Sequence, residues 1–145
     1  MYYEDSEALN ELKRVDHLLF VTLKYTRTVD IIKNILERLI SAMDCEVNEI
    51  IDYYKANGKI SNIMNAPLVK CKKLEVLFPK DKTVKDFVDF YHKLRKIILS
   101  DYKKKEEYRK NVALVTKESE VDIDKLKEFT EKTKNYIKYL RELIK

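Results

Sequence analysis

Residues 27 to 56, RTVDIIKNILERLISAMDCEVNEIIDYYKA, contain neither Gly nor Pro. Their apolar side chains recur at steps of three and four, which places them on one side of a helix. These side chains are Val29, Ile32, Ile35, Leu36, Leu39, Met43, Val47, Ile50 and Tyr54. The stretch therefore predicts one long amphipathic helix whose apolar stripe is buried against other helices.

The same spacing predicts four further helices. The first begins at Asp5 or Ser6, whose side chains suit an N-cap, and ends near Lys24. Gly58 ends the long helix, because glycine readily takes the left-handed conformation found at helix ends. The other predicted helices lie between Pro67 and Pro79, from a Thr83 cap to Tyr102, and from Leu126 to Ile144.

One segment departs from the helical spacing. Residues 111 to 116, NVALVT, and 120 to 123, EVDI, are short β-branched runs separated by the turn-like KES. They predict a small β-hairpin that lies on the helices or pairs with a second copy of the chain. The predicted fold class is mainly α, an up-and-down bundle of four to five helices with a short hairpin near 111–123. A chain of 145 residues is expected to form a single domain, residues 1–145.

The composition favours a cytoplasmic protein. The N-terminus lacks the basic and apolar pattern of a leader, and no window approaches a membrane-spanning apolar run. Lysine and isoleucine are abundant, while Gln and Trp do not occur. A thermophilic source explains this composition, and so does an AT-rich genome.

No metal or cofactor is expected. Cys45 and Cys71 lack a CxxC partner or a nearby histidine, which favours reduced thiols. Neither HExxH nor GxSxG occurs, and Gly58, the single glycine, cannot form a glycine-rich phosphate loop.

Positive charge is concentrated in residues 68–110. This block carries 14 basic and 7 acidic side chains, a net charge of +7, against −3 for residues 1–67 and +1 for residues 111–145. Such an excess is typical of nucleic-acid contact, although a solvated lysine surface is the competing interpretation. Tyr102 and Tyr108 offer rings for base stacking, or for packing alone. The candidate nucleic-acid-binding residues are Lys70, Lys72, Lys73, Lys103, Lys104, Lys105, Arg109 and Lys110.

Two histidines are the candidates for acid-base catalysis. His17 follows Arg14 by three residues, and His92 precedes Arg95 by three. A cationic neighbour can assist a catalytic histidine. We favour the simpler interpretation that both are helical histidines satisfied by local groups, so that the chain has no catalytic residue.

Two stretches carry a resemblance to known proteins. They are DHLLFVTLKYTRTVDIIKNILERLISAM, residues 16–43, and EYRKNVALVTKESEVDIDKLKEFTEKTKNYI, residues 107–137. Both resemble a family of small archaeal helical proteins, and the helix layout is similar to that of HEPN-type bundles. The resemblance implies an archaeal origin, a helical bundle and self-association.

The resemblance does not extend to a catalytic motif. HEPN ribonucleases carry a histidine four to six residues after an arginine, at a helical dimer interface. Here His17 follows Arg14 too closely, and no histidine follows Arg95 or Arg109. If the fold is HEPN-like, the resemblance implies a non-catalytic member.

The sequence therefore predicts a non-catalytic helical interaction module that forms a homodimer and binds a protein partner, without contact to membranes. The alternative is a HEPN-like nucleic-acid-binding or ribonuclease-related protein that uses residues 68–110.

Overall fold

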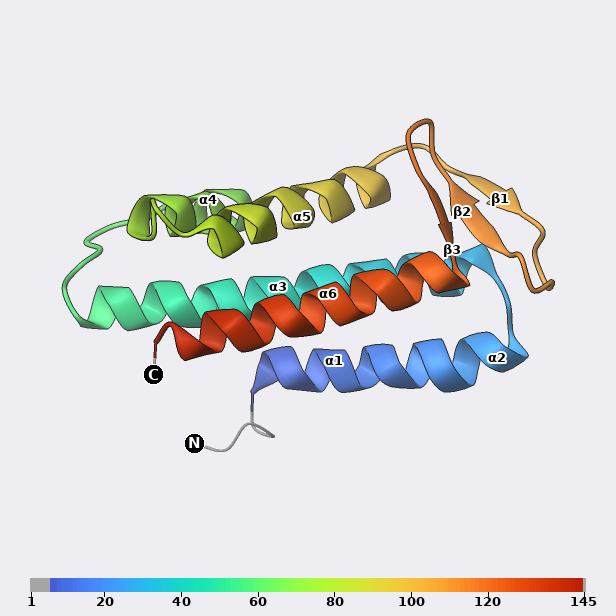
Figure 1. The fold of residues 1–145 in the computed structure, drawn as a ribbon, viewed down its shortest axis with the longest axis horizontal. Helices are drawn as coiled ribbons and strands as arrows, with labels where there is room; N and C mark the ends of the chain where they lie inside the picture. Colours follow the sequence, from blue (N-terminus) through green and yellow to red (C-terminus); the bar gives the residue numbers. More distant parts are fainter. Residues whose placement is uncertain (1–5, 145) are drawn as a thin grey trace.

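A computed structural model describes residues 6–144 and confirms the mainly α fold (Figure 1). The first helix is α1 (Glu7–His17), which continues through a π-helical turn, η2 (Leu18–Thr22), into α2 (Leu23–Tyr25). The other helices are α3 (Val29–Ala56), α4 (Pro67–Leu77), α5 (Lys82–Leu99) and α6 (Ile123–Glu142). A three-stranded antiparallel sheet contains β1 (Lys103–Lys105), β2 (Ala113–Val115) and β3 (Glu120–Asp122).

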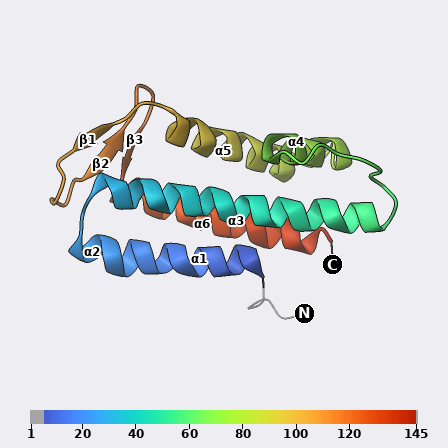
Figure 2. The same cartoon turned by 180° about the vertical axis from the view of Figure 1, so that it is seen from behind.

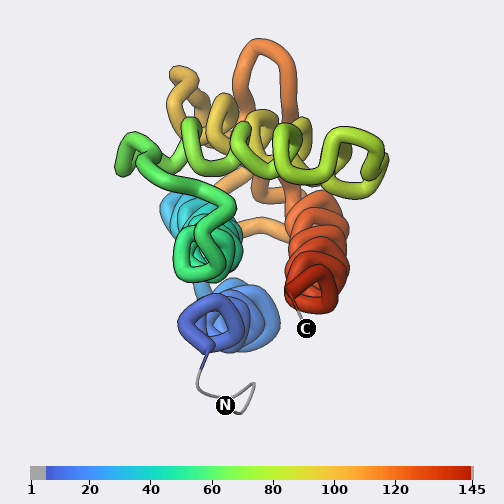
Figure 3. The backbone as a smooth tube through the Cα atoms, turned by 90° about the vertical axis from the view of Figure 1, so that its left-hand side faces the viewer, coloured from blue at the N-terminus to red at the C-terminus, as the bar shows by residue number. Residues whose placement is uncertain are grey.

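The long helices run up and down, as predicted. α3 and α6 run in the same direction and form a central layer, with α1 on one side and α4 and α5 on the other (Figures 1 and 2). Seen from the end of the bundle, α3 and α6 lie between α1 and α5 (Figure 3). α3 packs against α1, α4, α5 and α6, so it is the centre of the core. Its predicted stripe is buried from Val29 to Ile50, including Ile32, Leu36 and Leu39, while Tyr54 at its end is half-buried.

Side-chain caps fix where the helices begin. Ser6 caps α1 as predicted, by accepting a hydrogen bond from the Leu9 amide, while Asp5 lies outside the described residues. The predicted Thr83 cap is wrong. Asp81 caps α5 instead, because its carboxylate accepts a hydrogen bond from the Val84 amide at 3.1 Å. Gly58 adopts a φ of 76° just after α3, as its predicted role requires.

The predicted hairpin is confirmed and carries a third strand. β2 pairs with β3, with Leu114 opposite Val121, and both of these side chains are buried. β1 pairs along the other edge of β2, with Lys104 opposite Leu114. α5 therefore ends at Leu99, before the predicted end at Tyr102.

The loop between β1 and β2 is tied to the start of α3. A Glu107 carboxylate oxygen accepts a hydrogen bond from the Val29 amide at 2.8 Å, and the Tyr108 amide donates to the Arg27 carbonyl at 2.7 Å. The carboxylate thereby satisfies one of the free amides at a helix N-terminus. These contacts hold the sheet against the end of the bundle where α3 begins.

Candidate functional site

A groove between α1 and α6 has an apolar floor. Its volume is about 520 Å³, and Leu9, Leu12 and Ile137 line it together with charged side chains. Both helices pack on α3, and they contact one another less than they contact α3. An apolar groove of this size with a few polar groups at its margin is the usual form of a binding site.

Lysines from both helices line this groove. Lys134 of α6 forms an ion pair with Asp16 of α1, with 2.8 Å between Nζ and Oδ1. Lys13 of α1 and Lys138 of α6 also line the groove, and both are exposed. Within residues 6–144 neither of these two forms an ion pair. The groove therefore combines an apolar floor with an excess of positive charge, because four cations line it against two acids, Asp16 and Glu142.

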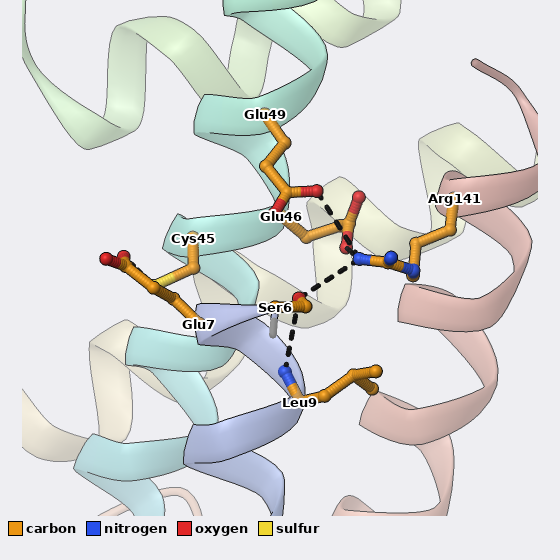
Figure 4. Close-up of polar contacts among 7 residues, drawn as sticks. All are labelled: Ser6, Glu7, Leu9, Cys45, Glu46, Glu49 and Arg141. Carbon is orange, nitrogen blue, oxygen red and sulfur yellow. Dashed lines mark hydrogen bonds and ion pairs between the residues drawn. The ribbon is translucent and has the colours of Figure 1, made fainter. Parts of the chain in front are cut away.

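One end of the groove is closed by Arg141. Its Nη1 donates to Ser6 Oγ at 3.0 Å, to Glu46 Oε1 at 3.3 Å and to Glu49 Oε2 at 3.4 Å (Figure 4). These partners come from the start of α1 and from the middle of α3. A single guanidinium nitrogen on α6 thus links this helix to α1 and α3.

Glu46 is the most deeply buried acid of this cluster. Its side chain is 0% exposed, and its Oε2 has no hydrogen-bond partner among the described residues. Burial and the neighbouring Glu49 raise the pKa of Glu46 to about 7, while Arg141 opposes this rise. Glu46 is therefore close to its titration midpoint at neutral pH.

A second, basic pocket lies between α1 and α3. Lys13, Arg14, His17, Asn34 and Arg38 line a volume of about 370 Å³. The structure thus brings the predicted pair, Arg14 and His17, to one pocket and adds Arg38 from α3. The buried carboxylate of Glu11 pairs with Arg14 at 2.7 Å and with Arg38 at 3.3 Å.

The other predicted pair, His92 and Arg95, does not converge. Arg95 donates to the Tyr91 hydroxyl at 3.2 Å, and that hydroxyl donates to Asp44 at 2.5 Å. His92 is half-buried and meets the edge of the Tyr91 ring. Burial raises the pKa of Asp44, and burial together with the Asp44 contact raises that of Tyr91. This network joins α3 to α5 within the core, and none of its members lines the groove or the basic pocket.

The eight candidate nucleic-acid-binding residues fall into two separate groups. Lys70, Lys72 and Lys73 lie on α4, while the other five lie on β1 and its following loop. α4 and the sheet occupy opposite ends of α5 (Figure 1), a helix about 27 Å long from its 18 residues. The eight candidate residues therefore do not gather at one place on the molecule.

Several of these lysines have local partners. Lys104 pairs with Asp30 and Glu107, Lys105 pairs with Glu120 at 2.7 Å, and Lys70 donates to Asn48. Lys72, Lys103, Arg109 and Lys110 are exposed, and Lys73 is half-buried. Tyr108 is 74% exposed, whereas Tyr102 packs beside the core with Lys33 over its ring.

Other chemical sites have less support. Cys45 and Cys71 are free thiols, and burial raises the pKa of Cys45 to about 11 and that of Cys71 to about 12. Within residues 6–144 no cluster of His, Cys, Asp and Glu suits a metal ion. No helix in the same range is long and apolar enough to cross a membrane.

The sequence contained one signal for the buried acids. Glu11 lies between Ala8 and Val15 on the apolar stripe of α1, and Glu46 lies beside Met43 and Val47 on that of α3. An acid at a stripe position must find a cationic partner when it is buried. For Glu11 the sequence offers Arg14, three residues later on the same helix, but it does not identify Arg38. For Glu46 it does not identify Arg141, because that residue comes from another helix.

Comparison with protein families, curated proteins and solved structures finds no match to this chain.

Proposed function

We propose that this protein is a non-catalytic helical binding module whose α1–α6 groove binds an amphipathic helix of a partner protein. The observation that carries the proposal is the apolar floor of the groove, bordered by Lys13 and Lys138. A bound helix would place its apolar stripe on the half-buried Leu9, above Leu12 and Ile137, which are 5% and 1% exposed at the floor of the groove.

Charge selects the kind of helix. Two lysines that lack ion pairs within the described residues favour a helix with Asp or Glu beside its apolar stripe. A basic helix would face repulsion from both lysines, which disfavours it. The expected partner is therefore an acidic amphipathic helix.

Two designed peptides test this proposal. One carries a leucine stripe flanked by glutamates, and its twin carries lysines at the flanking positions. We expect the acidic peptide to shift the NMR signals of Leu9, Leu12 and Ile137, and a Lys13→Glu, Lys138→Glu double variant to weaken binding. Lys127→Glu is the matched control, because Lys127 is exposed on α6 and does not line the groove. Equal binding of both peptides, or shifts confined to other surfaces, would contradict the proposal.

Self-association remains part of the proposed function. Phe20 and Tyr25 are 53% and 81% exposed on η2 and α2, and they offer apolar surface to a second copy. The outer edge of the sheet is less suited to pairing, because β1 consists of three exposed lysines that oppose edge-to-edge contact.

A second candidate function is nucleic-acid binding at the sheet end of the molecule. It is supported by Lys103 on β1 and by Arg109 and Lys110 in the following loop, which are exposed like Tyr108 of the same loop. If it holds, binding of single-stranded RNA will weaken steeply with salt, and replacing these three cations by Gln will abolish it. RNA cleavage would contradict the non-catalytic proposal. The HEPN-like relationship, the archaeal and thermophilic source and the cytoplasmic location remain predictions.

A further inference from the structure

The basic pocket between α1 and α3 is separate from the proposed helix groove, apart from Lys13, which lines both. Its cations come from two helices that pack closely together. Lys13, Arg14 and His17 share one side of α1 at steps of three and four residues, and Asn34 and Arg38 do so on α3. The packing of α1 on α3 therefore brings five polar side chains together around one pocket.

Glu11 holds the two arginines in place. Its side chain is only 10% exposed, and its carboxylate contacts Nη1 of both Arg14 and Arg38. The side chains of Arg14 and Arg38 are 62% and 40% exposed, so each presents further N–H donors to solvent. A buried carboxylate shared by two guanidiniums reduces their freedom before any ligand arrives, which lowers the entropic cost of binding.

The charge of the pocket matches a doubly charged anion. Lys13, Arg14 and Arg38 carry three positive charges, and Glu11 removes one, leaving a charge of +2 before any contribution from His17. A phosphate monoester carries about −1.5 to −2 at neutral pH and offers three acceptor oxygens. Arginine forks bind such oxygens in pairs.

From this geometry we propose that the α1–α3 pocket is a binding site for the phosphate group of a small phosphate monoester. Arg14 and Arg38 bind the phosphate oxygens, and Lys13 supplies the remaining charge. His17 and Asn34 provide polar contacts for the group that carries the phosphate. The volume of about 370 Å³ accommodates more than the phosphate itself.

Calorimetric titration of the whole chain tests the proposal. The probes are inorganic phosphate, adenosine 5′-monophosphate and adenosine. We expect both phosphate-bearing probes to bind saturably and adenosine not to bind. A phosphate diester, tested as a short RNA without terminal phosphate, is expected to bind more weakly than the monophosphate.

Variants locate the binding in the pocket. Arg14→Gln and Arg38→Gln are each expected to weaken binding by at least about tenfold, which corresponds to one lost charged hydrogen bond. Lys127→Gln, a charge change on α6 outside the pocket, is expected to leave the affinity unchanged. Should Arg38→Gln fail to fold because Glu11 loses a partner, Arg14→Gln still tests the site, since Arg38 continues to pair with Glu11. Absence of saturable phosphate binding, or equal affinity of wild type and Arg14→Gln, would overturn the proposal.

Discussion

At the scale of single residues, the buried side chains of α3 determine stability. Leu39 is fully buried in the centre of the bundle, two residues after the exposed Glu37. Burial of a leucine stabilises the fold by removing apolar surface from water and by close packing. Neighbouring side chains on one helix therefore contribute very differently to the free energy of unfolding.

Leu39→Ala is expected to lower the free energy of unfolding by about 2–5 kcal/mol, because truncation loses transfer energy and leaves a cavity. Glu37→Ala is the matched control on the same helix and should change stability by no more than about 0.5 kcal/mol. Chemical denaturation of both variants measures the difference. A mild effect of Leu39→Ala would mean that α3 presents another face to the core.

Glu46 gives the protein a pH-dependent stability. Its pKa rises from the ordinary 4.5 to about 7 on folding, chiefly through burial. Between pH 4.5 and about 7 the folded chain holds a proton on Glu46 that the unfolded chain releases. The contribution of Glu46 to the free energy of unfolding is therefore fully present at low pH and is lost as the pH rises through about 7. The loss amounts to at most about 3 kcal/mol at 1.36 kcal/mol per pKa unit.

Glu46→Gln is therefore expected to be more stable than wild type at pH 8 and similar to it at pH 5. The amide keeps an acceptor for Arg141 but carries no charge to bury. Denaturation curves across this pH range measure the effect, with Glu37→Gln as the control that retains the wild-type slope. Parallel profiles for wild type and Glu46→Gln would show that Glu46 does not titrate in this way.

At the scale of elements, the loop after β1 joins the sheet to the bundle. Thr28 is the N-cap of α3, and Glu107, 78 residues away, adds a second acceptor there by bonding to the Val29 amide, while the neighbouring Tyr108 amide bonds to Arg27. Lys104 pairs with both Glu107 and Asp30, so the lysine-rich strand contributes ion pairs at the start of α3. Part of the basic segment thus has a structural role.

Glu107→Ala is expected to cost about 1.5–3 kcal/mol of stability, the usual effect of losing a hydrogen bond to a charged group, although the Thr28 cap remains. Glu107→Gln keeps an acceptor oxygen for the Val29 amide and should cost less. Thermal unfolding compares the two, and amide exchange at Val29 reports the Glu107 hydrogen bond directly. Unchanged protection of Val29 in Glu107→Ala would refute this role.

At the scale of the whole molecule, the exposed apolar side chains of η2 and α2 bear on self-association. The chain has a mass of 17.4 kDa, so light scattering should give twice this value for the proposed dimer. Phe20→Glu is expected to shift the mass toward the monomer, because it buries a charge at the contact. Val76→Glu, at an apolar position on α4 that is 66% exposed, is the control. A wild-type mass of one chain would exclude the dimer.

Local sequence determined most of the helical fold. The recurrence of apolar residues from Val29 to Tyr54 and the Gly58 stop depend only on near neighbours, so the helix could be predicted with its limits. The strand β1 could not be predicted, because its three lysines show no alternation of apolar and polar residues. Its extended conformation depends on backbone pairing with β2. Asp81 was missed as a cap in favour of Thr83, since both residue types suit the position.

The tertiary structure alone decided the candidate sites. Arg141 meets Glu46 from 95 positions away, and Lys134 meets Asp16 from 118 positions away. Likewise Arg38 joins Arg14 only because α3 lies along α1, and the two lysine clusters separate because α5 lies between them. Helical periodicity specifies which face of each helix is apolar, whereas the choice of facing helices depends on packing of the whole chain. The charged residues that form each site are therefore brought together by that packing.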